Sequence, residues 1–352
     1  MNGKFLLYGS YGYTGQLIAE LAVQLGMSPI LAGRDAGRLK QQAQQLGLPF
    51  QAFSLEDTAA LDKALSEVDL ILLAAGPFQH TYQPVAAACL RTGRHYLDIT
   101  GEIAVFEGLA KMDAAARQAG VMLLPGSGFD VVPSDCLAAH LKGRLPDATH
   151  LTIAIRSQGG GFSQGTALTM LEGIHLPGAV RKEGRLQSLV TGSVQRSFDF
   201  GRGPRPAVNI AWGDLSTDYW STQIPNIETF MSFSPGINRM LGLSGSLRGL
   251  LGLKIVKGLL ARAVKSGPAG PSAEQRRTGR TYLYAEVRNA QGKQAAARLE
   301  TPETYALTAV TSLMIAEKIM QGQMKPGFQT PSTVYGAGLI LEVPTTRQVD
   351  LD

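Results

Sequence analysis

The chain has 352 residues, of which 44% are hydrophobic and 17% charged. A chain of this length exceeds the size at which one core usually stops growing, so two globular domains are expected and a disordered chain is excluded. The net charge of +5 identifies no partner, because its sign reports only attraction to anions. No run of about 20 apolar residues is present, and Met1–Lys4 leads directly into a strand-like segment, so we expect a cytoplasmic protein.

The two cysteines, Cys89 and Cys136, both fall in apolar helical patterns. Such patterns favour buried free thiols over a disulfide or metal site, and they fit a reducing cytoplasm. No group of His, Cys and carboxylate residues has metal-ligand spacing, and no serine stands in a nucleophile-elbow pattern. The sequence therefore predicts no metal and disfavours a hydrolase.

The first 124 residues alternate between strand-like and helix-like segments. Strands are predicted at 5–8, 30–32, 50–53, 70–74, 95–98 and 121–124, and helices at 16–25, 36–46, 58–66, 84–92 and 106–119. Such alternation implies a parallel sheet covered by helices on both faces. The predicted fold class is α/β, with a Rossmann-type doubly wound sheet.

After Pro133 this alternation breaks. A helix is predicted at 136–142, followed by strands at 151–156, 194–200, 219–223, 228–233, 282–288 and 295–300. These strands favour a second domain rich in antiparallel pairs, with 289–292 joining the last two as a hairpin. Thr301-Pro302-Glu303 supplies a cap, a proline and an early acid, which predict a long helix ending at Met320.

A glycine-rich loop separates the first strand from the first helix. It comprises Gly9, Ser10, Tyr11, Gly12, Tyr13, Thr14 and Gly15. The G-x-x-G-x-x-G spacing permits a tight turn, a close backbone approach and an exposed helix N-terminus that can receive phosphate. Because the loop opens a βαβ unit, it predicts a dinucleotide site rather than an ordinary glycine turn.

The end of the second strand reads Ala32-Gly33-Arg34, where an NAD-binding unit usually carries an acid for the ribose. The missing acid removes repulsion against a 2′-phosphate, and the Arg34 guanidinium can pair with that group. The sequence therefore predicts NADP(H), with Gly33 and Arg34 at the ribose. Arg38 is either a second phosphate contact or a surface charge. Asp35 either caps the next helix or brings an acid near the ribose.

Two further strand ends are predicted to touch the cofactor. Ala75, Gly76, Pro77 and Phe78 follow the fourth strand. Ligands of open α/β sheets lie beyond the carboxyl ends of the strands, although an ordinary turn explains the same residues. Ser54 and Leu55, after the third strand, are the candidates to flank adenine.

These segments resemble the saccharopine dehydrogenase-like superfamily, particularly its saccharopine dehydrogenase-like oxidoreductase and trans-acting enoyl reductase branch. The resemblance spans most of the chain and rests on the glycine loop, Ala32–Arg34, Gly76–Phe78, His95–Glu102 and Gly128–Asp135. It implies an NADP-binding Rossmann domain at 1–145, an inserted α+β substrate or dimerisation domain at 146–301, and a return to the Rossmann domain at 302–352. Tyr11 is bulkier than the family's common Ser or Thr, and we expect it to crowd or stack on the cofactor.

Four side chains are candidate catalytic groups. His80 and Tyr82 follow the Gly76-Pro77-Phe78 turn and are candidate proton donors at the nicotinamide; a surface histidine and a packing tyrosine are the alternatives. Asp98, just after the fifth strand, either orients a donor or substrate amine or caps the next helix. Asp130 either reaches the active cleft or holds its glycine-rich turn through an Asx bond.

Leucines interleave with basic residues between 239 and 265. This pattern fits a membrane-surface segment, a lid over an apolar substrate, a helix pair covering the domain or a homodimer contact. The basic residues do not interleave with aromatic ones, so nucleic acid is not expected as a partner.

With the resemblance, this segment favours an NADP(H)-dependent oxidoreductase that reduces a C=C or related unsaturated group of a lipid-like or polyketide-like substrate, free or carrier-bound. One alternative is a saccharopine-type amino-acid or imine dehydrogenase. The other is an NADP-bound sensor or peripheral membrane protein without turnover.

Overall fold

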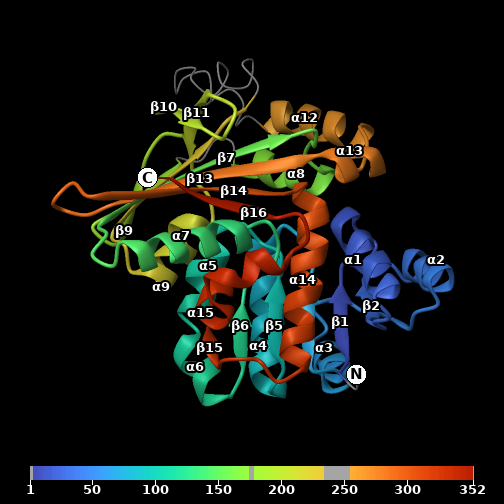
Figure 1. Cartoon of the computed structure of the whole chain (residues 1–352). Helices are drawn as coiled ribbons and strands as arrows, with labels where there is room; N and C mark the ends of the chain where they lie inside the picture. The colour runs from blue at the N-terminus through green and yellow to red at the C-terminus, as the bar shows by residue number, and fades with distance from the viewer. Residues whose placement is uncertain (1–2, 174–177, 234–253, 352) are drawn as a thin grey trace. The chain divides into compact units, whose positions relative to one another are not determined.

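The computed structural model describes residues 3–173, 178–233 and 254–351 (Figure 1). The chain forms two compact units, one of 1–132 and 305–343 and the other of 133–304 and 344–352. These bounds differ from the predicted 1–145, 146–301 and 302–352. The helix that begins at Val132 lies mainly in the second unit. Residues 305–343 return to the first unit, whereas the strand at 347–351 joins the second unit's sheet.

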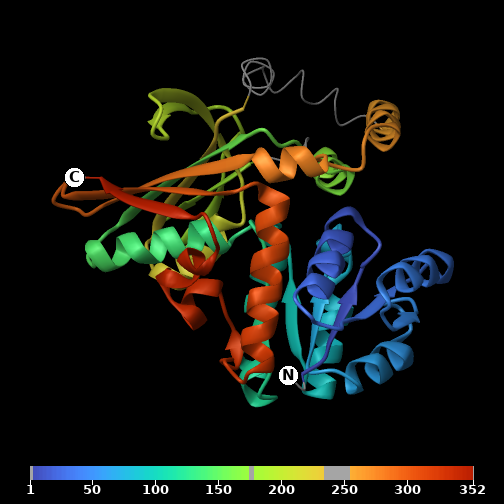
Figure 2. The same ribbon diagram turned by 45° about the vertical axis from the view of Figure 1, so that its right-hand side comes forward.

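The first unit holds a seven-stranded sheet in the order β15-β6-β5-β4-β1-β2-β3. Figure 2 shows the strands and helices of its N-terminal part in blue and cyan. Its strands are β1 (Phe5–Tyr8), β2 (Ile30–Gly33), β3 (Phe50–Ala52), β4 (Leu70–Leu73), β5 (His95–Asp98), β6 (Met122–Leu124) and β15 (Gly327–Phe328). All neighbouring strands pair in parallel. The predicted Rossmann-type sheet is therefore confirmed.

Helices connect these strands. They are α1 (Tyr13–Gln24), α2 (Ala36–Leu46), α3 (Thr58–Ser66), α4 (Tyr82–Thr92), α5 (Ile103–Ala110), α6 (Asp113–Gln118), α14 (Thr304–Met320) and α15 (Pro331–Tyr335), with 3₁₀ turns η1 (Phe78–His80) and η2 (Ala337–Glu342). Every residue of β1, β2 and β4 is buried, as expected for parallel strands covered on both faces. The strand order reverses between β1 and β4, which is where such sheets bind ligands.

The second unit holds a mixed nine-stranded sheet with the main order β10-β11-β12-β7-β13-β14-β16. Its strands are β7 (His150–Gln158), β8 (Ala179–Lys182), β9 (Arg185–Ser188), β10 (Gln195–Asp199), β11 (Pro204–Ile210), β12 (Asn226–Met231), β13 (Arg280–Arg288), β14 (Gln294–Pro302) and β16 (Arg347–Leu351). Its helices within the described residues are α7 (Val132–Arg144), α8 (Gln164–Gly173), α9 (Asp214–Thr222), α12 (Lys254–Ser266) and α13 (Ala273–Thr278). Apart from the parallel pair β12–β7, all its pairs are antiparallel.

This second sheet is rolled. Three strands separate β10 from β13 in the sheet order, yet the rings of Phe198 on β10 and Tyr284 on β13 lie 5.6 Å apart. Asp199 of β10 also pairs with Arg298 of β14 at 2.8 Å. Curvature brings these strands together, so part of the unit's core lies inside the roll.

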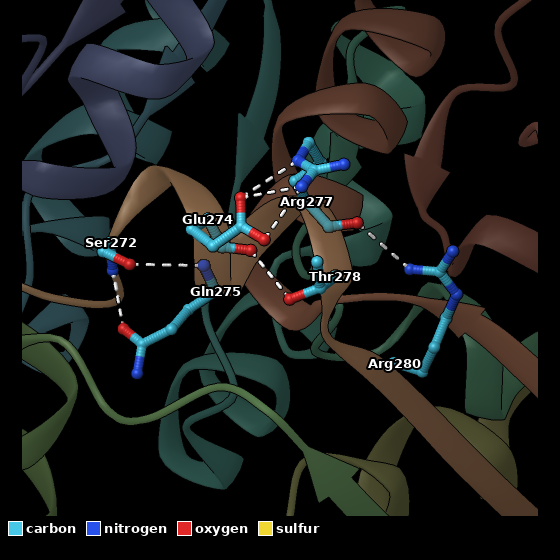
Figure 3. A network of polar contacts seen from close by, with 6 residues as sticks. All are labelled: Ser272, Glu274, Gln275, Arg277, Thr278 and Arg280. Atoms are coloured by element: carbon cyan, nitrogen blue, oxygen red, sulfur yellow. Dashed lines mark hydrogen bonds and ion pairs between the residues drawn. The ribbon is translucent and has the colours of Figure 1, made fainter.

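Local polar contacts fix the start of helix α13 (Figure 3). The Ser272 hydroxyl accepts from the Gln275 N–H at 3.2 Å, and the Gln275 amide oxygen accepts from the Ser272 N–H at 2.8 Å. This capping box satisfies two donors at the helix start. Glu274 pairs with Arg277 one turn later at 2.8 Å, and β13 follows directly.

Two sequence predictions in the second half are wrong. Residues 219–223, predicted as a strand, lie mainly in α9, whose buried face includes Asp214, Leu215 and Asp218. The aromatic and β-branched residues in 219–222 favour a strand locally, but packing overrides that propensity. Thr301 and Pro302 pair within β14 rather than capping the long helix, which begins at Thr304.

The predicted helix at 106–119 is two helices, α5 and α6, broken at Lys111 and Met112. Of the predicted basic and apolar segment 239–265, residues 239–253 lie outside the described part of the chain, and 254–265 fall in α12. No helix within the described residues is both long and apolar enough to cross a bilayer. Cys89 and Cys136 are buried free thiols, as predicted.

Candidate functional site

The loop after β1 has the geometry of a phosphate cradle. Gly9 has a φ of +87°, which L-residues with a side chain rarely adopt. A Cβ on Gly15 would lie 2.2 Å from the Gly9 carbonyl oxygen, so only glycine fits there. Gly12 precedes the first residue of α1. The first N–H groups of that helix have no partners within it, and such groups bind anions.

A buried polar pair joins this loop to α2. The Ser10 hydroxyl donates to the Gln42 amide oxygen at 2.8 Å, and the Gln42 amide nitrogen donates to the Ser10 carbonyl at 2.8 Å. Ser10 therefore supports the loop through its own side chain. Sequence reasoning missed Gln42, because it stands in a polar run from Lys40 to Gln45 that gives no signal of burial.

Tyr11 lies at the end of β2. Its phenol oxygen accepts from the N–H groups of Arg34 and Asp35 at 3.2 and 3.3 Å. A Cβ on Gly33 would lie 2.5 Å from the Tyr11 ring. The Arg38 guanidinium lies 4.5 Å from the ring centroid and donates to the Tyr11 carbonyl at 2.9 Å. Tyr11 therefore holds the end of β2, and its stacking on the cofactor stays a prediction.

Asp35 caps α2. Its carboxylate accepts from the Arg38 N–H at 3.0 Å, and β2 ends earlier, at Gly33. The predicted capping role of Asp35 is thus confirmed. The strand end carries no acid, while Arg34 and Arg38 are both exposed there, so a 2′-phosphate fits this position better than a free ribose diol.

Tyr13 and Thr14 open α1. The Tyr13 ring meets Tyr305 of α14 edge to face, with centroids 5.2 Å apart and planes at 88°. This contact belongs to the energetically preferred geometries of aromatic pairs. It ties the start of α1 to α14, a helix that is distant in sequence.

The turn after β4 adjoins the glycine loop. A Cβ on Gly9 would lie 2.9 Å from the Ala75 Cβ, so the two strand ends touch. Gly76 and Pro77 follow, and the Glu102 carboxylate then accepts from the N–H groups of Phe78 and Gln79, both at 2.8 Å. Glu102, after β5, fixes the start of η1.

Ser54 and Leu55 follow β3 at the same edge of the sheet. Leu55 is a core residue with 9% exposure. The Ser54 hydroxyl accepts from the Glu56 N–H at 3.3 Å. Core packing accounts for Leu55, and the hydrogen bond to Glu56 accounts for the Ser54 side chain. The placement of both residues beside adenine stays a prediction.

Asp98 is fully buried at the end of β5. Its carboxylate accepts from the Tyr96 hydroxyl at 2.5 Å and from the N–H groups of Thr100 and Gly126 at 2.9 and 2.8 Å. Burial raises the pKa of Asp98 to about 7, against the lowering effect of these donors. Asp98 thus joins β5 to the loop after β6 and has the contacts of a structural residue.

The other three candidate catalytic groups differ in exposure. His80 is exposed at the end of η1, with its Nε2 3.3 Å from the Gln79 side-chain nitrogen. The Tyr82 phenol faces Gly108 of α5, where a Cβ would lie 2.4 Å from its oxygen. Asp130 is half-buried after β6, with its carboxylate against Gly101. His80 is the most accessible of them.

These features together describe a dinucleotide-binding Rossmann unit. The cradle admits no Cβ at Gly15, the helix start can receive a pyrophosphate, and the end of β2 offers guanidinium groups without an acid. The residues present therefore fit NADP(H).

Residues 5–124 match the saccharopine dehydrogenase NADP binding domain family. The first unit thus carries an NADP-binding domain of this family. The predicted family and cofactor are confirmed.

This chain is also similar to several named proteins. The trans-acting enoyl reductase of Mycobacterium ulcerans is 24% identical over 410 residues, covering 98% of this chain and 96% of the relative. The trans-acting enoyl reductase of Mycobacterium leprae is 36% identical over 40% of this chain and 35% of its own length. Mouse saccharopine dehydrogenase-like oxidoreductase is 28% identical over 50% and 47%. The matched segments span less than half of the last two relatives.

Among solved structures, the apo saccharopine dehydrogenase (L-Glu forming) of Saccharomyces cerevisiae matches with a TM-score of 0.69 and 12% identity, covering all of both chains. At this identity the match supports the fold alone. It extends through both units, so the second, mixed-sheet unit also has a counterpart there.

Proposed function

We propose that the chain is an NADPH-dependent reductase of a C=C or related unsaturated group in an apolar, lipid-like or polyketide-like substrate. The observation that carries this proposal is the similarity to the Mycobacterium ulcerans trans-acting enoyl reductase, which covers 98% of this chain. The bound cofactor supplies a hydride to one carbon of the double bond, and a proton must reach the other carbon.

The proposed roles of the residues follow from their positions. The loop Gly9–Gly15 binds the pyrophosphate, and Arg34 with Arg38 binds the 2′-phosphate. Ala75–Phe78 borders the nicotinamide half, because it follows β4 at the point where the strand order reverses. The loop thus fixes the cofactor, while the substrate must be held by other parts of the chain.

His80 is the proposed proton donor. It is exposed after β4, and histidine is the side chain that enzymes use most often for proton transfer. The buried Asp98 carboxylate already accepts three hydrogen bonds, and Tyr82 packs against α5. Both residues are therefore poorer candidates for proton transfer to the substrate. Asp130 is the second choice, because it lies at the same edge of the sheet.

The test is oxidation of NADPH with two substrate panels, α,β-unsaturated thioesters of different chain length and cyclic imines bearing a carboxylate. The proposal expects turnover that increases with the length of the apolar chain and no turnover of imines. Turnover of imines alone would support the saccharopine-type dehydrogenase and refute the enoyl reductase.

Two histidine variants test the donor. His80→Gln is expected to lower kcat for a thioester about 100-fold, within the range that general acids contribute. His150→Gln is the matched control, because His150 is also exposed but lies on β7 of the second unit. If His80→Gln keeps wild-type kcat, Asp130→Asn is tested next and the role of His80 is rejected.

A second candidate function is attachment to a lipid surface. On the basic helix α12, Leu259 is 60% exposed and Leu260 is 37% exposed, a combination typical of interfacial helices. A Caenorhabditis elegans relative, 26% identical over 54% of this chain and 50% of its own length, is named lipid droplet localized protein. The test is flotation with anionic liposomes, which Leu259→Glu should abolish and Val190→Glu, a substitution at another exposed apolar residue, should not.

Two further expectations stay predictions. Buried free thiols at Cys89 and Cys136 fit a cytoplasmic location. The homodimer is to be checked by measuring the molar mass in solution by light scattering.

A further inference from the structure

We propose that Tyr11 is a specificity-determining residue, which selects the 2′-phosphorylated cofactor by holding Arg38 ready at the end of β2. The inference rests on the NADP site of the first unit and does not depend on which substrate is reduced. Tyr11 therefore acts through Arg38 and is a positioning residue.

Tyr11 closes the turn between β2 and α2. Its phenol oxygen accepts from two consecutive backbone N–H groups, those of Arg34 and Asp35, at 3.2 and 3.3 Å. Its ring lies against Gly33, where a Cβ would lie 2.5 Å from it. These contacts hold the backbone that carries Arg34.

Tyr11 also holds Arg38 in two ways. The guanidinium lies over the ring at 4.5 Å from the centroid, and one of its terminal nitrogens donates to the Tyr11 carbonyl at 2.9 Å. A guanidinium has five N–H donors, so the N–H groups that do not bind the Tyr11 carbonyl can bind a phosphate. Arginine loses much rotamer freedom when it binds, and prior ordering lowers that cost.

The same arrangement keeps the Asp35 carboxylate from competing with a 2′-phosphate for Arg38. Its carboxylate accepts the Arg38 backbone N–H at 3.0 Å as the cap of α2, so it is turned to the helix. The end of β2 then offers guanidinium groups and the phenol, which favours a 2′-phosphate over the two hydroxyls of an NAD ribose.

The experiment measures dissociation constants of NADPH, NADH, 2′,5′-ADP and 5′-ADP for the full chain by calorimetry. The variants are Tyr11→Phe, Tyr11→Ser, Arg38→Gln and the double variant Tyr11→Ser/Arg38→Gln. Tyr284→Phe on β13 of the second unit is the matched control. Thermal unfolding of each variant shows whether it folds.

Tyr11→Ser is expected to weaken NADPH and 2′,5′-ADP about tenfold, the size of a partly desolvated cation–π contact with its ordering. NADH and 5′-ADP should change less than threefold. Tyr11→Phe keeps the ring under Arg38 and should lose only part of the selectivity. Tyr11→Ser should cost little more once Arg38 is glutamine, because Tyr11 acts through Arg38.

Equal weakening of NADPH and NADH by Tyr11→Ser would overturn the inference, since Tyr11 would then only shape the loop. Additive losses in the double variant would also overturn it. Failure of every enoyl substrate would leave these binding constants unaffected, so the two proposals fail separately.

Discussion

The smallest features of the site are positions where no side chain fits. A Cβ on Gly15 would lie 2.2 Å from the Gly9 carbonyl oxygen and 2.9 Å from the Ser10 Cα. Both of these are backbone atoms, which cannot turn aside as a flexible side chain can. The glycine spacing was visible in the sequence, because the turn itself requires these residues.

Gly15→Ala should therefore displace the loop and weaken NADPH binding at least tenfold. Gly143→Ala on α7 is the control, because a Cβ there meets nothing within 4 Å, and it should stabilise the helix by about 0.5–1 kcal/mol. Calorimetric titration and urea unfolding measure both effects. Wild-type affinity in Gly15→Ala would contradict the cradle geometry.

Asp98→Asn tests the structural role of that carboxylate. The amide oxygen can still accept from the Thr100 and Gly126 N–H groups, which share one oxygen of the carboxylate, but the NH₂ cannot accept from the Tyr96 hydroxyl. The substitution should therefore cost about 1–3 kcal/mol of unfolding free energy. Asp62→Asn, which breaks the exposed pair with Arg91, should cost less than about 1 kcal/mol. Equal losses in urea unfolding would show that Asp98 does not hold the loop.

At the scale of elements, the sequence predicted the first unit better than the second. Residues 5–8, 36–46, 58–66 and 95–98 have the predicted bounds, because fully apolar strands and capped amphipathic helices carry their own signals. Helix α9 was missed because the aromatic and β-branched residues in 219–222 favour a strand, and because its buried aspartates interrupt the apolar face of an amphipathic helix. The roll of the second sheet depends on contacts between strands far apart in sequence, which periodicity does not reveal.

Phe198→Ala tests the interior of the roll. Phe198 is 3% exposed and lies 5.2 Å from Phe230 and 5.6 Å from Tyr284 between ring centroids. Its truncation should cost about 3–5 kcal/mol, while NADPH binding stays at the wild-type level below the unfolding transition. Phe50→Ala, at a ring with 39% exposure, should cost much less, and equal costs would contradict a packed roll.

At the scale of the whole molecule, the stability should depend on pH through buried carboxyl groups. Burial raises the pKa of Asp98 from its usual 3.8 to about 7. Burial also raises the pKa of Asp214 and Asp218 in α9, and the neighbouring Asp135 adds to the rise. The folded state then holds protons that the unfolded state has released. Asp98 and Asp214 therefore stabilise the fold fully below about pH 4 and lose that effect as pH rises through about 7.

The free energy of unfolding should therefore fall between about pH 6 and pH 8, by up to about 1.4 kcal/mol per group and pH unit. Asp214→Asn should reduce this slope, because the amide does not titrate. Urea unfolding at the two pH values measures it. A wild-type midpoint that rises with pH over this interval would contradict the assignment.

The sequence also predicted the cofactor better than the chemistry. The glycine loop and the Arg34 strand end need only local spacing, whereas the proton donor depends on which of His80, Tyr82, Asp98 and Asp130 stays accessible. Burial separates these four, and burial follows from long-range packing.

Isotope transfer shows directly whether NADPH reduces an unsaturated substrate. NADPH carrying deuterium on one face of C4 is incubated with an α,β-unsaturated thioester, and the product is examined by mass spectrometry. We expect one deuterium per product molecule from one of the two C4-labelled forms and none from the other. A product without deuterium from either form, or no saturated product at all, would contradict it.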